Sequence, residues 1–340
     1  EDSPDVLLLY PELLDSFLQS DMLEPLDQEL FFNTSGKGNP EILVNVRSAW
    51  TTDGTCRYIA PFFFLSGLIT EDQYAEKLSN YTFSDLQNLA REENCAMFGN
   101  QTQAPIGALS FSIQNRFISQ EDHSVSFGSP DFLEFLAFYK NLNDELEQNR
   151  GQNPKHIVIW RDLHSFRDFL NVSELYKTPV TMISFPDMET DAPLVLAPMY
   201  YAVSANAKEK EGAFAFLSFL LSSDVQSHYR ALGEGDMPVT ATYFEDMITQ
   251  DLQSYVPGSN GTSDSTASAA SGIPDETLQA LPQVFRTLAA KSDTTYLANG
   301  EVISLIYEEL QPFMTGDKSA EETAKTIQNR MSVFVWETAG

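Results

Sequence analysis

The residues best suited to acid–base or metal chemistry near neutral pH are the four histidines of this 340-residue chain, His123, His156, His164 and His228. No two of them lie at a spacing typical of metal ligands, and the sequence contains no HExxH, GxSxG or GxxxxGK(S/T) motif. We therefore interpret the histidines as surface or capped residues. The sequence predicts no catalytic residue, no metal site and no cofactor.

Carboxylates are the other candidate catalysts, because the chain carries 49 acidic side chains. A glycoside hydrolase needs two carboxyl groups roughly 5 to 10 Å apart in space, and the sequence gives no pair priority. The acidic run Asp187–Asp191 superficially resembles a calcium-binding loop, but Ala192 replaces the glycine of its sixth position and Pro198 the glutamate of its twelfth. We interpret the run as a solvated loop and keep a glycoside hydrolase as a less favoured function.

Charge and hydropathy exclude several kinds of partner. With 20 basic against 49 acidic residues, the formal net charge of −29 would repel a nucleic acid backbone or an anionic lipid surface. No apolar run reaches the roughly 18 residues of a membrane span. Cys56 and Cys95 are too far apart for a paired metal-ligand motif, and we interpret them as structural thiols. A disulfide between them would suit an exported protein, but sequence alone cannot bring the two side chains together.

Short apolar strands alternate with amphipathic helices through the first half of the chain, and helices dominate the last third. This alternation predicts an α/β protein with a mostly parallel sheet. The first strand is expected to be buried and parallel. The predicted strands are Val6–Tyr10, Tyr58–Leu65, His156–Trp160 and Val180–Phe185.

Several predicted helices carry start signals. Ser129 precedes a proline and an aspartate and should cap a helix, while Ser319 and Glu322 form a capping box. Thr277–Leu288 has the apolar spacing of another amphipathic helix. By contrast, residues 257–272 contain almost no bulky side chains and are expected to form a mobile loop.

The most informative stretch covers residues 182–239. It joins a Phe185-Pro186 strand end, an acidic loop, a second strand, the helix Lys208-Glu-Lys-Glu-Gly-Ala-Phe-Ala-Phe-Leu-Ser-Phe-Leu-Leu221 and a Pro238-Val239 turn. This order of motifs resembles the family 1 extracellular solute-binding proteins of ABC importers, the group that includes maltose-binding-like lipoproteins. Tyr58–Gly67 and Asn299–Trp336 resemble further segments of that family, so the resemblance covers nearly the whole chain.

The resemblance implies a two-lobed periplasmic-binding-protein-like fold of type II, in which a ligand binds between two α/β lobes without being turned over. It places the first lobe at residues 1–65 and 194–240, and the second, helix-rich lobe at residues 66–193 and 241–340. The family's lipid-anchored cysteine and first strand–helix units have no counterpart before Val6. We therefore expect a first lobe that is incomplete at its N-terminus and exposes a strand edge.

A carbohydrate ligand needs flat aromatic surfaces and charged or amide groups that bond its hydroxyls. Trp160 ends a predicted strand, where open α/β sheets place ligand contacts, although a core position is an equal alternative. Only one of Tyr200 and Tyr201 should face a ligand. At least one of the three consecutive phenylalanines at 62–64 should lie in the core, because successive strand residues point to opposite faces. Glu234 could also be a solvated loop acid. The candidate ligand-binding residues are Trp160, Arg161, Tyr200, Tyr201, Phe63 and Glu234.

The favoured function is capture of a small polar ligand, most of all a carbohydrate or oligosaccharide, and its delivery to the transmembrane subunits of an ABC permease. The resemblance implies an extracellular or periplasmic location, with a lipoprotein anchor as the only link to the membrane. A binder of peptides or of another polar solute is the alternative. Aromatic residues at ligand-facing positions would favour sugar, whereas a buried acid that pairs with a ligand amine would favour peptide.

Overall fold

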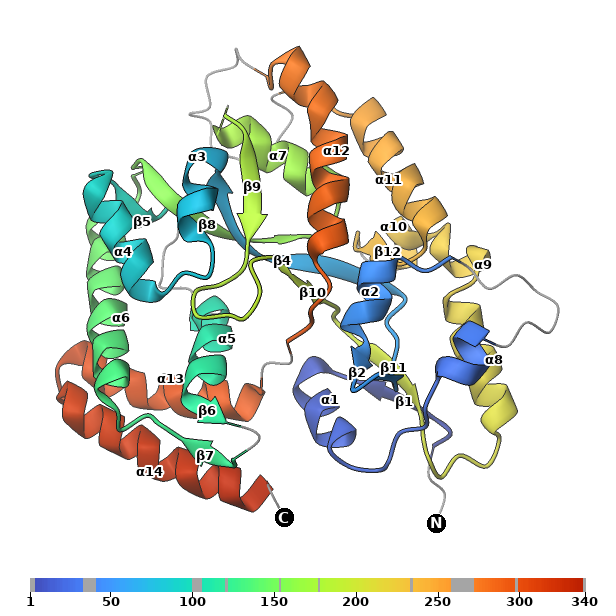
Figure 1. Ribbon diagram of the computed structural model, residues 1–340, viewed down its shortest axis with the longest axis horizontal. Coiled ribbons are helices and arrows are strands. Elements are labelled where there is room, and N and C mark those ends of the chain that lie inside the picture. The colour runs from blue at the N-terminus through green and yellow to red at the C-terminus, as the bar shows by residue number, and fades with distance from the viewer. Residues whose placement is uncertain are drawn as a thin grey trace. The chain divides into compact units, whose positions relative to one another are not determined.

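The structure is a computed structural model of the whole chain (Figure 1). It describes residues 4–32, 41–99, 106–119, 122–152, 154–176, 178–232, 235–257, 272–296 and 299–338. The predicted mobile loop at residues 257–272 lies almost entirely outside these ranges. In the part of the chain that is described, no helix is long and apolar enough to cross a bilayer.

The chain divides into two compact units. Unit 1 holds residues 1–66, 162–181 and 192–297, and unit 2 holds residues 67–161, 182–191 and 298–340. The chain first passes from one unit to the other at Ser66–Gly67, within a long strand. Residues 162–181 and 241–297, which were expected in the second lobe, group with unit 1. Their helices α7 (Phe166–Tyr176), α11 (Ala241–Gln253) and α12 (Asp275–Lys291) contact one another, and α12 contacts α2 (Val44–Ala49).

Unit 1 combines short strands with helices. Its elements are β1 (Val6–Leu9), α1 (Pro11–Leu18), a π-helical turn (Asp27–Phe32), α2 (Val44–Ala49), β2 (Thr51–Thr52), β3 (Thr55–Cys56), α7 (Phe166–Tyr176), β10 (Leu194–Leu196), β11 (Tyr200–Val203), α8 (Lys210–Leu220), α9 (Ser223–Gln226), α10 (Tyr229–Leu232), β12 (Met237–Pro238), α11 (Ala241–Gln253) and α12 (Asp275–Lys291).

The first strand was predicted to be buried and parallel, and both predictions are wrong. β1 pairs with β11 in antiparallel register, Leu9 opposite Tyr200, and the two strands form a sheet of their own. Of its four residues only Leu9 is buried, while Leu8 is 49% exposed. An antiparallel pair can leave one face to solvent, whereas parallel strands need cover on both faces, so the apolar run was a misleading signal.

Aromatic stacking forms the core between the helices of unit 1. Phe285 of α12 lies with its ring centroid 5.2 Å from Phe166 and 5.6 Å from Phe169, both on α7. Phe244 of α11 stacks on Phe285 at 5.9 Å. Asp251 of α11, which is almost wholly buried, accepts a 3.0 Å hydrogen bond from the backbone N–H of Arg167. These contacts join α7, α11 and α12 (Figure 1).

Unit 2 is richer in helix. Its elements are α3 (Asp72–Ala75), a 3-10 turn (Glu76–Leu78), α4 (Phe83–Glu92), β5 (Ala96–Phe98), α5 (Ile106–Phe117), β6 (Ile118–Ser119), β7 (Ser124–Val125), α6 (Pro130–Gln148), α13 (Gly300–Thr315) and α14 (Ala320–Thr338). Three strands contribute residues to both units, namely β4 (Phe62–Glu71), β8 (His156–Leu163) and β9 (Val180–Ile183).

The main sheet is mixed, so the expectation of a mostly parallel sheet is wrong. β4 pairs with β10 and with β12 in antiparallel register, and only β5 and β8 form a parallel pair among the registers that the structure defines. The side chain of Ser66 bonds Asp162, and Thr70 bonds the carbonyl of Ile157, so β4 and β8 run in opposite directions. The alternation of strands with helices had predicted a parallel sheet, but it does not fix the direction in which a strand joins the sheet.

The predicted helix starts are confirmed. Ser129 accepts a hydrogen bond from the backbone N–H of Phe132 at the start of α6. Ser319 and Glu322 bond each other's backbone N–H groups at the start of α14, as a capping box requires. The predicted helix Thr277–Leu288 lies within α12. These signals depend on residues only a few positions apart, so they can be recognised in the sequence alone.

The two cysteines are not bonded to each other. Cys56 belongs to unit 1 and is fully buried, where its thiol donates to the carbonyl of Tyr58 at 3.1 Å. Burial, with a smaller effect from Asp27, raises the pKa of Cys56 to about 12. Cys95 belongs to unit 2 and is partly exposed. The hypothesis of a disulfide between them is therefore not supported, and Cys56 is an unreactive structural thiol.

Candidate ligand-binding site

The strand β8 leaves the hydrophobic core at Trp160. Residues 157–159 of this strand are buried, whereas Trp160, Arg161 and Asp162 are each partly exposed. The guanidinium of Arg161 donates to the carbonyl of Trp160 at 3.0 Å, which holds the charged group close to the strand. Trp160 and Arg161 end the first segment of unit 2, and Asp162 begins the second segment of unit 1. An indole and a cation are therefore adjacent and partly exposed within β8, which continues to Leu163, three residues beyond the predicted strand end at Trp160.

A second group of aromatic and polar side chains lies within unit 1, and we call it the His164 cluster. Its members are Phe64, Ser66, Asp162, His164 and Asp236. The Nδ1 atom of His164 lies 2.6 Å from Oδ1 of Asp236, and its ring lies 4.9 Å from that of Phe64, tilted by 33°. The hydroxyl of Ser66 donates to Asp162 at 2.6 Å. The cluster thus joins one aromatic face to two carboxylates and an imidazole.

Strand register brings these distant residues together. β12 pairs with the start of β4, Met237 opposite Phe63, so Asp236 arrives near Phe64 although the two are far apart in sequence. The buried amide of Gln226 fixes this pairing, because it donates to the carbonyl of Pro61 at 2.8 Å and accepts from the backbone N–H of Val239 at 2.9 Å. Gln226 thus joins the residues that flank the β4–β12 pair.

His164 itself is held by the start of α7. Its backbone N–H donates to the carboxylate of Asp168 at 3.0 Å, and the hydroxyl of Ser165 donates to the same group at 3.0 Å. The His164 side chain remains 45% exposed, whereas that of Asp236 is only 7% exposed. A buried carboxylate thus presents a half-exposed imidazole to solvent.

Electrostatics favour the protonated form of this imidazole. The hydrogen bond to Asp236 raises the pKa of His164, burial opposes the shift, and the nearby carboxylates of Asp236, Asp168 and Asp162 add to it. An imidazolium donates hydrogen bonds from both ring nitrogens. Since Asp236 takes one of them, Nε2–H remains a donor for a ligand.

Two of the candidate ligand-binding residues lie in the core of unit 1. Phe63 is fully buried and stacks on Phe244 with ring centroids 6.3 Å apart. Tyr200 is 1% exposed, its ring packs edge-on against Tyr58 at 5.2 Å, and its hydroxyl accepts from the backbone N–H of Ala197 at 3.2 Å. Neither side chain presents surface to a ligand in this structure.

The adjacent residues behave as the alternation of a strand requires. Tyr201 is half-buried, with its ring 6.3 Å from that of Phe216 on α8, and Phe64 is partly exposed where Phe63 is not. Phe64, rather than Phe63, therefore belongs to the His164 cluster. Glu234 lies outside the described residues, whereas Asp236, two positions further along, is a member of the cluster.

Sequence reasoning missed most of this cluster. His164 was interpreted as a surface or capped histidine, and the roles of Asp162, Ser66 and Asp236 were not anticipated. A usable signal existed for His164, which follows the exposed end of a predicted strand only four residues after Trp160. No comparable signal marked Asp236, because its place depends on strand pairing.

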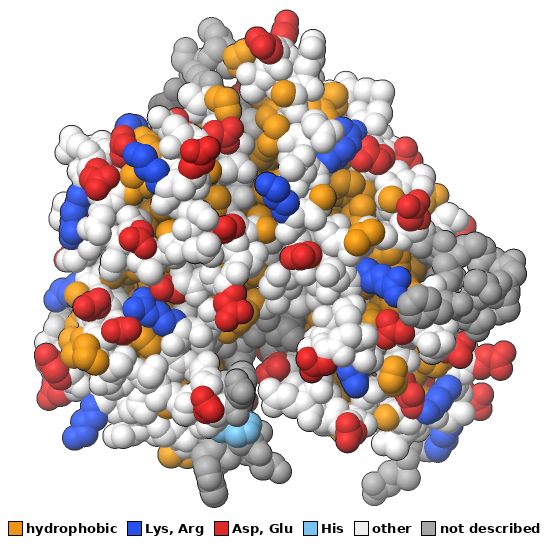
Figure 2. Space-filling model, in the orientation of Figure 1, with side chains coloured by type: hydrophobic (Ala, Val, Ile, Leu, Met, Phe, Trp, Pro, Cys, Tyr) orange, Lys and Arg blue, Asp and Glu red, His pale blue; other side chains and the backbone are white. Residues whose placement is uncertain are grey.

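The side chains of the candidate site can bond a polar ligand. Within the described ranges, no group of three or more histidine, cysteine, aspartate or glutamate side chains could hold a metal ion. Carboxylates, an imidazolium and a guanidinium can bond hydroxyl groups, and the Phe64 ring and the indole of Trp160 offer flat faces. Figure 2 shows acidic side chains spread over the visible face, interspersed with lysines and arginines rather than facing a basic patch.

Comparison with known proteins identifies the fold. Neither a family model nor a curated protein sequence matches the chain. Among solved structures, an ABC substrate-binding protein of Listeria monocytogenes in complex with cycloalternan matches with a TM-score of 0.54 at 14% sequence identity, over 98% of this chain and 85% of that one.

Two further solved structures are similar to this chain. An extracellular solute-binding protein of family 1 from Alicyclobacillus acidocaldarius gives a TM-score of 0.54 at 12% identity, over 98% of this chain and 84% of that one. The sugar-binding protein MalE of Xanthomonas citri gives a TM-score of 0.56 at 14% identity, over 99% and 85%. The chain therefore has the two-lobed periplasmic-binding-protein-like fold, which confirms the predicted fold class.

Proposed function

We propose that this protein is the solute-binding component of an ABC importer, that its ligand is a carbohydrate or oligosaccharide, and that it turns over no substrate. The observation that carries the proposal is the partial exposure of Trp160 and Arg161, which follow the buried residues 157–159 within β8. The His164 cluster of unit 1 supplies hydroxyl-bonding groups of the same kind. The shared fold supports the proposal, since structural neighbours of this chain have been solved with cycloalternan and with maltotriose.

The chemistry of these side chains is matched to a sugar. A pyranose ring has an apolar face that packs on an indole or phenyl ring, and hydroxyls at its edge that need both donors and acceptors. Arg161 and the His164 imidazolium donate, while the carboxylate of Asp162 accepts. We further propose that the protein acts outside the cytoplasm, anchored as a lipoprotein, and hands its ligand to the permease.

A binder of peptides or of other polar solutes is the second candidate, and one feature favours it. Asp236 is a buried carboxylate, and such a group suits a ligand amine. In this structure, however, Asp236 already pairs with His164 at 2.6 Å. The paired arrangement leaves the imidazole, not the acid, as the group that a ligand meets, so a neutral sugar is the better match.

A thermal-shift screen of the full chain against sugars and short peptides tests the proposal. A ligand present at 100 times its dissociation constant stabilises the protein by about 2.7 kcal/mol, which is readily detected. We expect at least one oligosaccharide to stabilise the protein more than any short peptide does at the same concentration. Stabilisation by peptides alone would replace sugar with the second candidate. Release of reducing ends from the stabilising oligosaccharide would instead show a hydrolase.

A further inference from the structure

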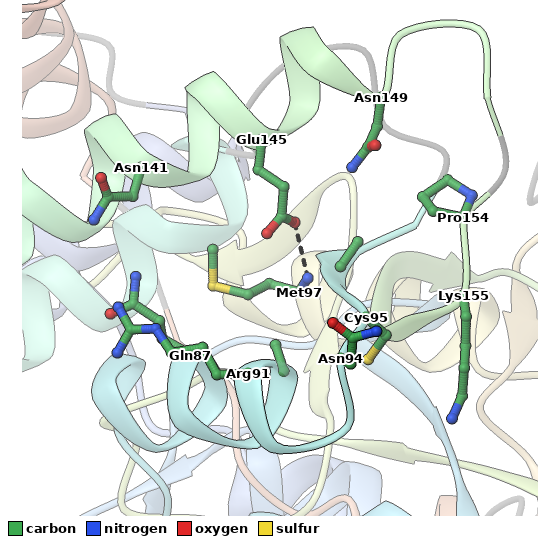
Figure 3. A pocket seen from close by; sticks show the side chains of 12 residues that line it. Gln87, Arg91, Asn94, Cys95, Met97, Asn141, Glu145, Asn149, Pro154 and Lys155 are labelled. Atoms are coloured by element: carbon green, nitrogen blue, oxygen red, sulfur yellow. Dashed lines mark hydrogen bonds between the residues drawn. The ribbon is translucent and has the colours of Figure 1, made fainter.

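A polar hollow of about 710 Å³ opens on unit 2, away from the residues discussed above (Figure 3). It is bordered by α4 on one side and α6 on the other, with the start of β5 and the residues before β8 between them. Lys155 precedes β8 at this end, and Trp160 lies five residues further along. At about 3.3 Å per strand residue, the two ends are roughly 16 Å apart. The hollow is therefore separate from Trp160 and Arg161.

The hollow lies along a sheet edge. β5 ends the order of strands in the main sheet, among the residues described, so its outer side has no strand neighbour. Glu145 of α6 closes that side, because its carboxylate accepts from the backbone N–H of Met97 at 2.8 Å and from that of Phe98. Burial raises the pKa of Glu145, and these two hydrogen bonds oppose the shift. The Glu145 carboxylate is thus already hydrogen-bonded to the backbone of β5.

Four amide side chains that line the hollow have no hydrogen-bond partner among the described residues. Gln87 and Asn94 at one side and Asn141 and Asn149 at the other form no side-chain hydrogen bond with any described residue, although all four line the hollow. In Figure 3 the side chain of Asn149 extends from α6 into the hollow, and that of Gln87 rises from α4 below it. Four primary amides offer donors and acceptors in equal supply, which suits hydroxyl or peptide groups.

One cation of the hollow also lacks an acidic partner. Lys155 lies 3.8 Å from a carboxylate oxygen of Glu93, which offsets its charge. Arg91 of α4 forms no ion pair with a described acid, and its only side-chain hydrogen bond is a 3.4 Å contact with Asn88. Arg91 is exposed, so its guanidinium is accessible to an anionic ligand. Its planar fork of donors matches a carboxylate.

We propose that this hollow is a second ligand site, which takes a small polar molecule that combines a carboxylate with amide or hydroxyl groups. Arg91 pairs with the carboxylate, and the amides of Gln87, Asn141 and Asn149 bond the rest of the ligand. The lining includes no aromatic side chain, so an apolar or ring-stacked ligand is not favoured. Two sources share this chemistry, namely the carboxyl end of a short peptide and an acidic sugar.

The reactivity of the Cys95 thiol can be used to detect a ligand in the hollow. The Cys95 thiol lines the hollow and is partly exposed, whereas Cys56 is fully buried. Burial raises the pKa of both thiols, so access to the reagent distinguishes them. Alkylation by N-ethylmaleimide under native conditions therefore reports on Cys95, and a Cys95→Ser variant confirms the assignment. A ligand in the hollow should slow this reaction. The readout does not depend on sugar binding elsewhere in the protein, so it stands or falls separately from the proposed function.

We use two pairs of probes. The first pair is N-acetyl-diglycine and its uncharged amide, and the second is glucuronate and glucose. These pairs differ mainly in the carboxylate. We expect one acid to protect Cys95 with a dissociation constant of about 1 mM, the affinity of a small weakly bound ligand, and its neutral counterpart to protect at least about tenfold less. Protection by N-acetyl-diglycine assigns the site to peptides, and protection by glucuronate assigns it to acidic sugars.

Arg91→Gln tests the assigned cation, and Arg150→Gln is the matched control. Both arginines are exposed residues of unit 2, but Arg150 pairs with Glu147 and does not line the hollow. Protection should weaken about tenfold in Arg91→Gln and stay unchanged in Arg150→Gln. The proposal is overturned if no probe protects Cys95, if acid and neutral probes protect equally, or if protection survives in Arg91→Gln.

Discussion

The Nδ1 atom of His164 lies 2.6 Å from Oδ1 of Asp236, and this contact joins the segment after β8 to the segment before β12. The carboxylate is buried and the imidazole is half-exposed. The pair therefore has a structural side, which faces the core, and a side that meets solvent or ligand.

Stability should depend on pH through this pair. The folded-state pKa of His164 is raised above its ordinary value of about 6.5. The pair therefore stabilises the fold fully below about pH 6.5, and the stabilisation is lost as pH rises through the raised folded-state pKa. We predict that Asp236→Asn lowers the pKa of His164 in an NMR titration and destabilises the protein more in mild acid than above neutrality.

The matched control for that experiment removes the titrating group. In a His164→Gln background, Asp236→Asn should destabilise the protein equally at acid and alkaline pH, because no imidazole is left to gain a proton. A pH dependence that persists in this background would show that another group is responsible.

Phe285 should be the most costly single aromatic to remove from unit 1, because it contacts Phe166, Phe169 and Phe244 at once. Phe285→Ala is expected to lower the free energy of unfolding by about 3 to 5 kcal/mol in urea denaturation. Its neighbour Val284 is 37% exposed, and Val284→Ala should cost no more than about 0.5 kcal/mol. Similar losses from both changes would mean that α12 does not pack as described.

Among the described glycines of unit 2, Gly99 is the one whose replacement should destabilise the protein most. A Cβ atom at this position would overlap the imidazole ring of His156, which is held by the carbonyl of Pro154 at 2.9 Å. We expect Gly99→Ala to destabilise the protein by about 1 to 3 kcal/mol, as overpacking does. Gly212 of α8 faces open space, so Gly212→Ala should be neutral or stabilise by up to about 1 kcal/mol. Chemical denaturation of the two variants side by side would contradict this account if their order were reversed.

The sequence predicted what is decided locally. The caps at Ser129 and Ser319, and the periodicity of α12, depend on residues three or four positions apart, and all were confirmed. The direction of β1 is set by β11, nearly two hundred residues away, and was predicted wrongly. The burial of Tyr200 and the place of Asp236 likewise depend on partners that no local pattern reveals.

The candidate site shows the same division. Trp160 and Arg161 could be named because a buried apolar run ends before them, which is visible in the sequence, although β8 itself continues to Leu163. The His164 cluster could not, because Phe64, Asp162 and Asp236 meet only through the pairing of β4 with β8 and β12. Strand register over such separations follows from the global fold rather than from propensity.

Isothermal titration of the full chain with maltotriose and cycloalternan, compared with its Trp160→Ala variant, tests the central claim most directly. The account predicts that an oligosaccharide binds with one-to-one stoichiometry and that Trp160→Ala weakens binding by about 1 to 3 kcal/mol, the range expected for a lost stacking ring, without altering secondary structure. No heat of binding from either sugar or from a wider oligosaccharide panel, or an unchanged affinity in Trp160→Ala, would contradict it.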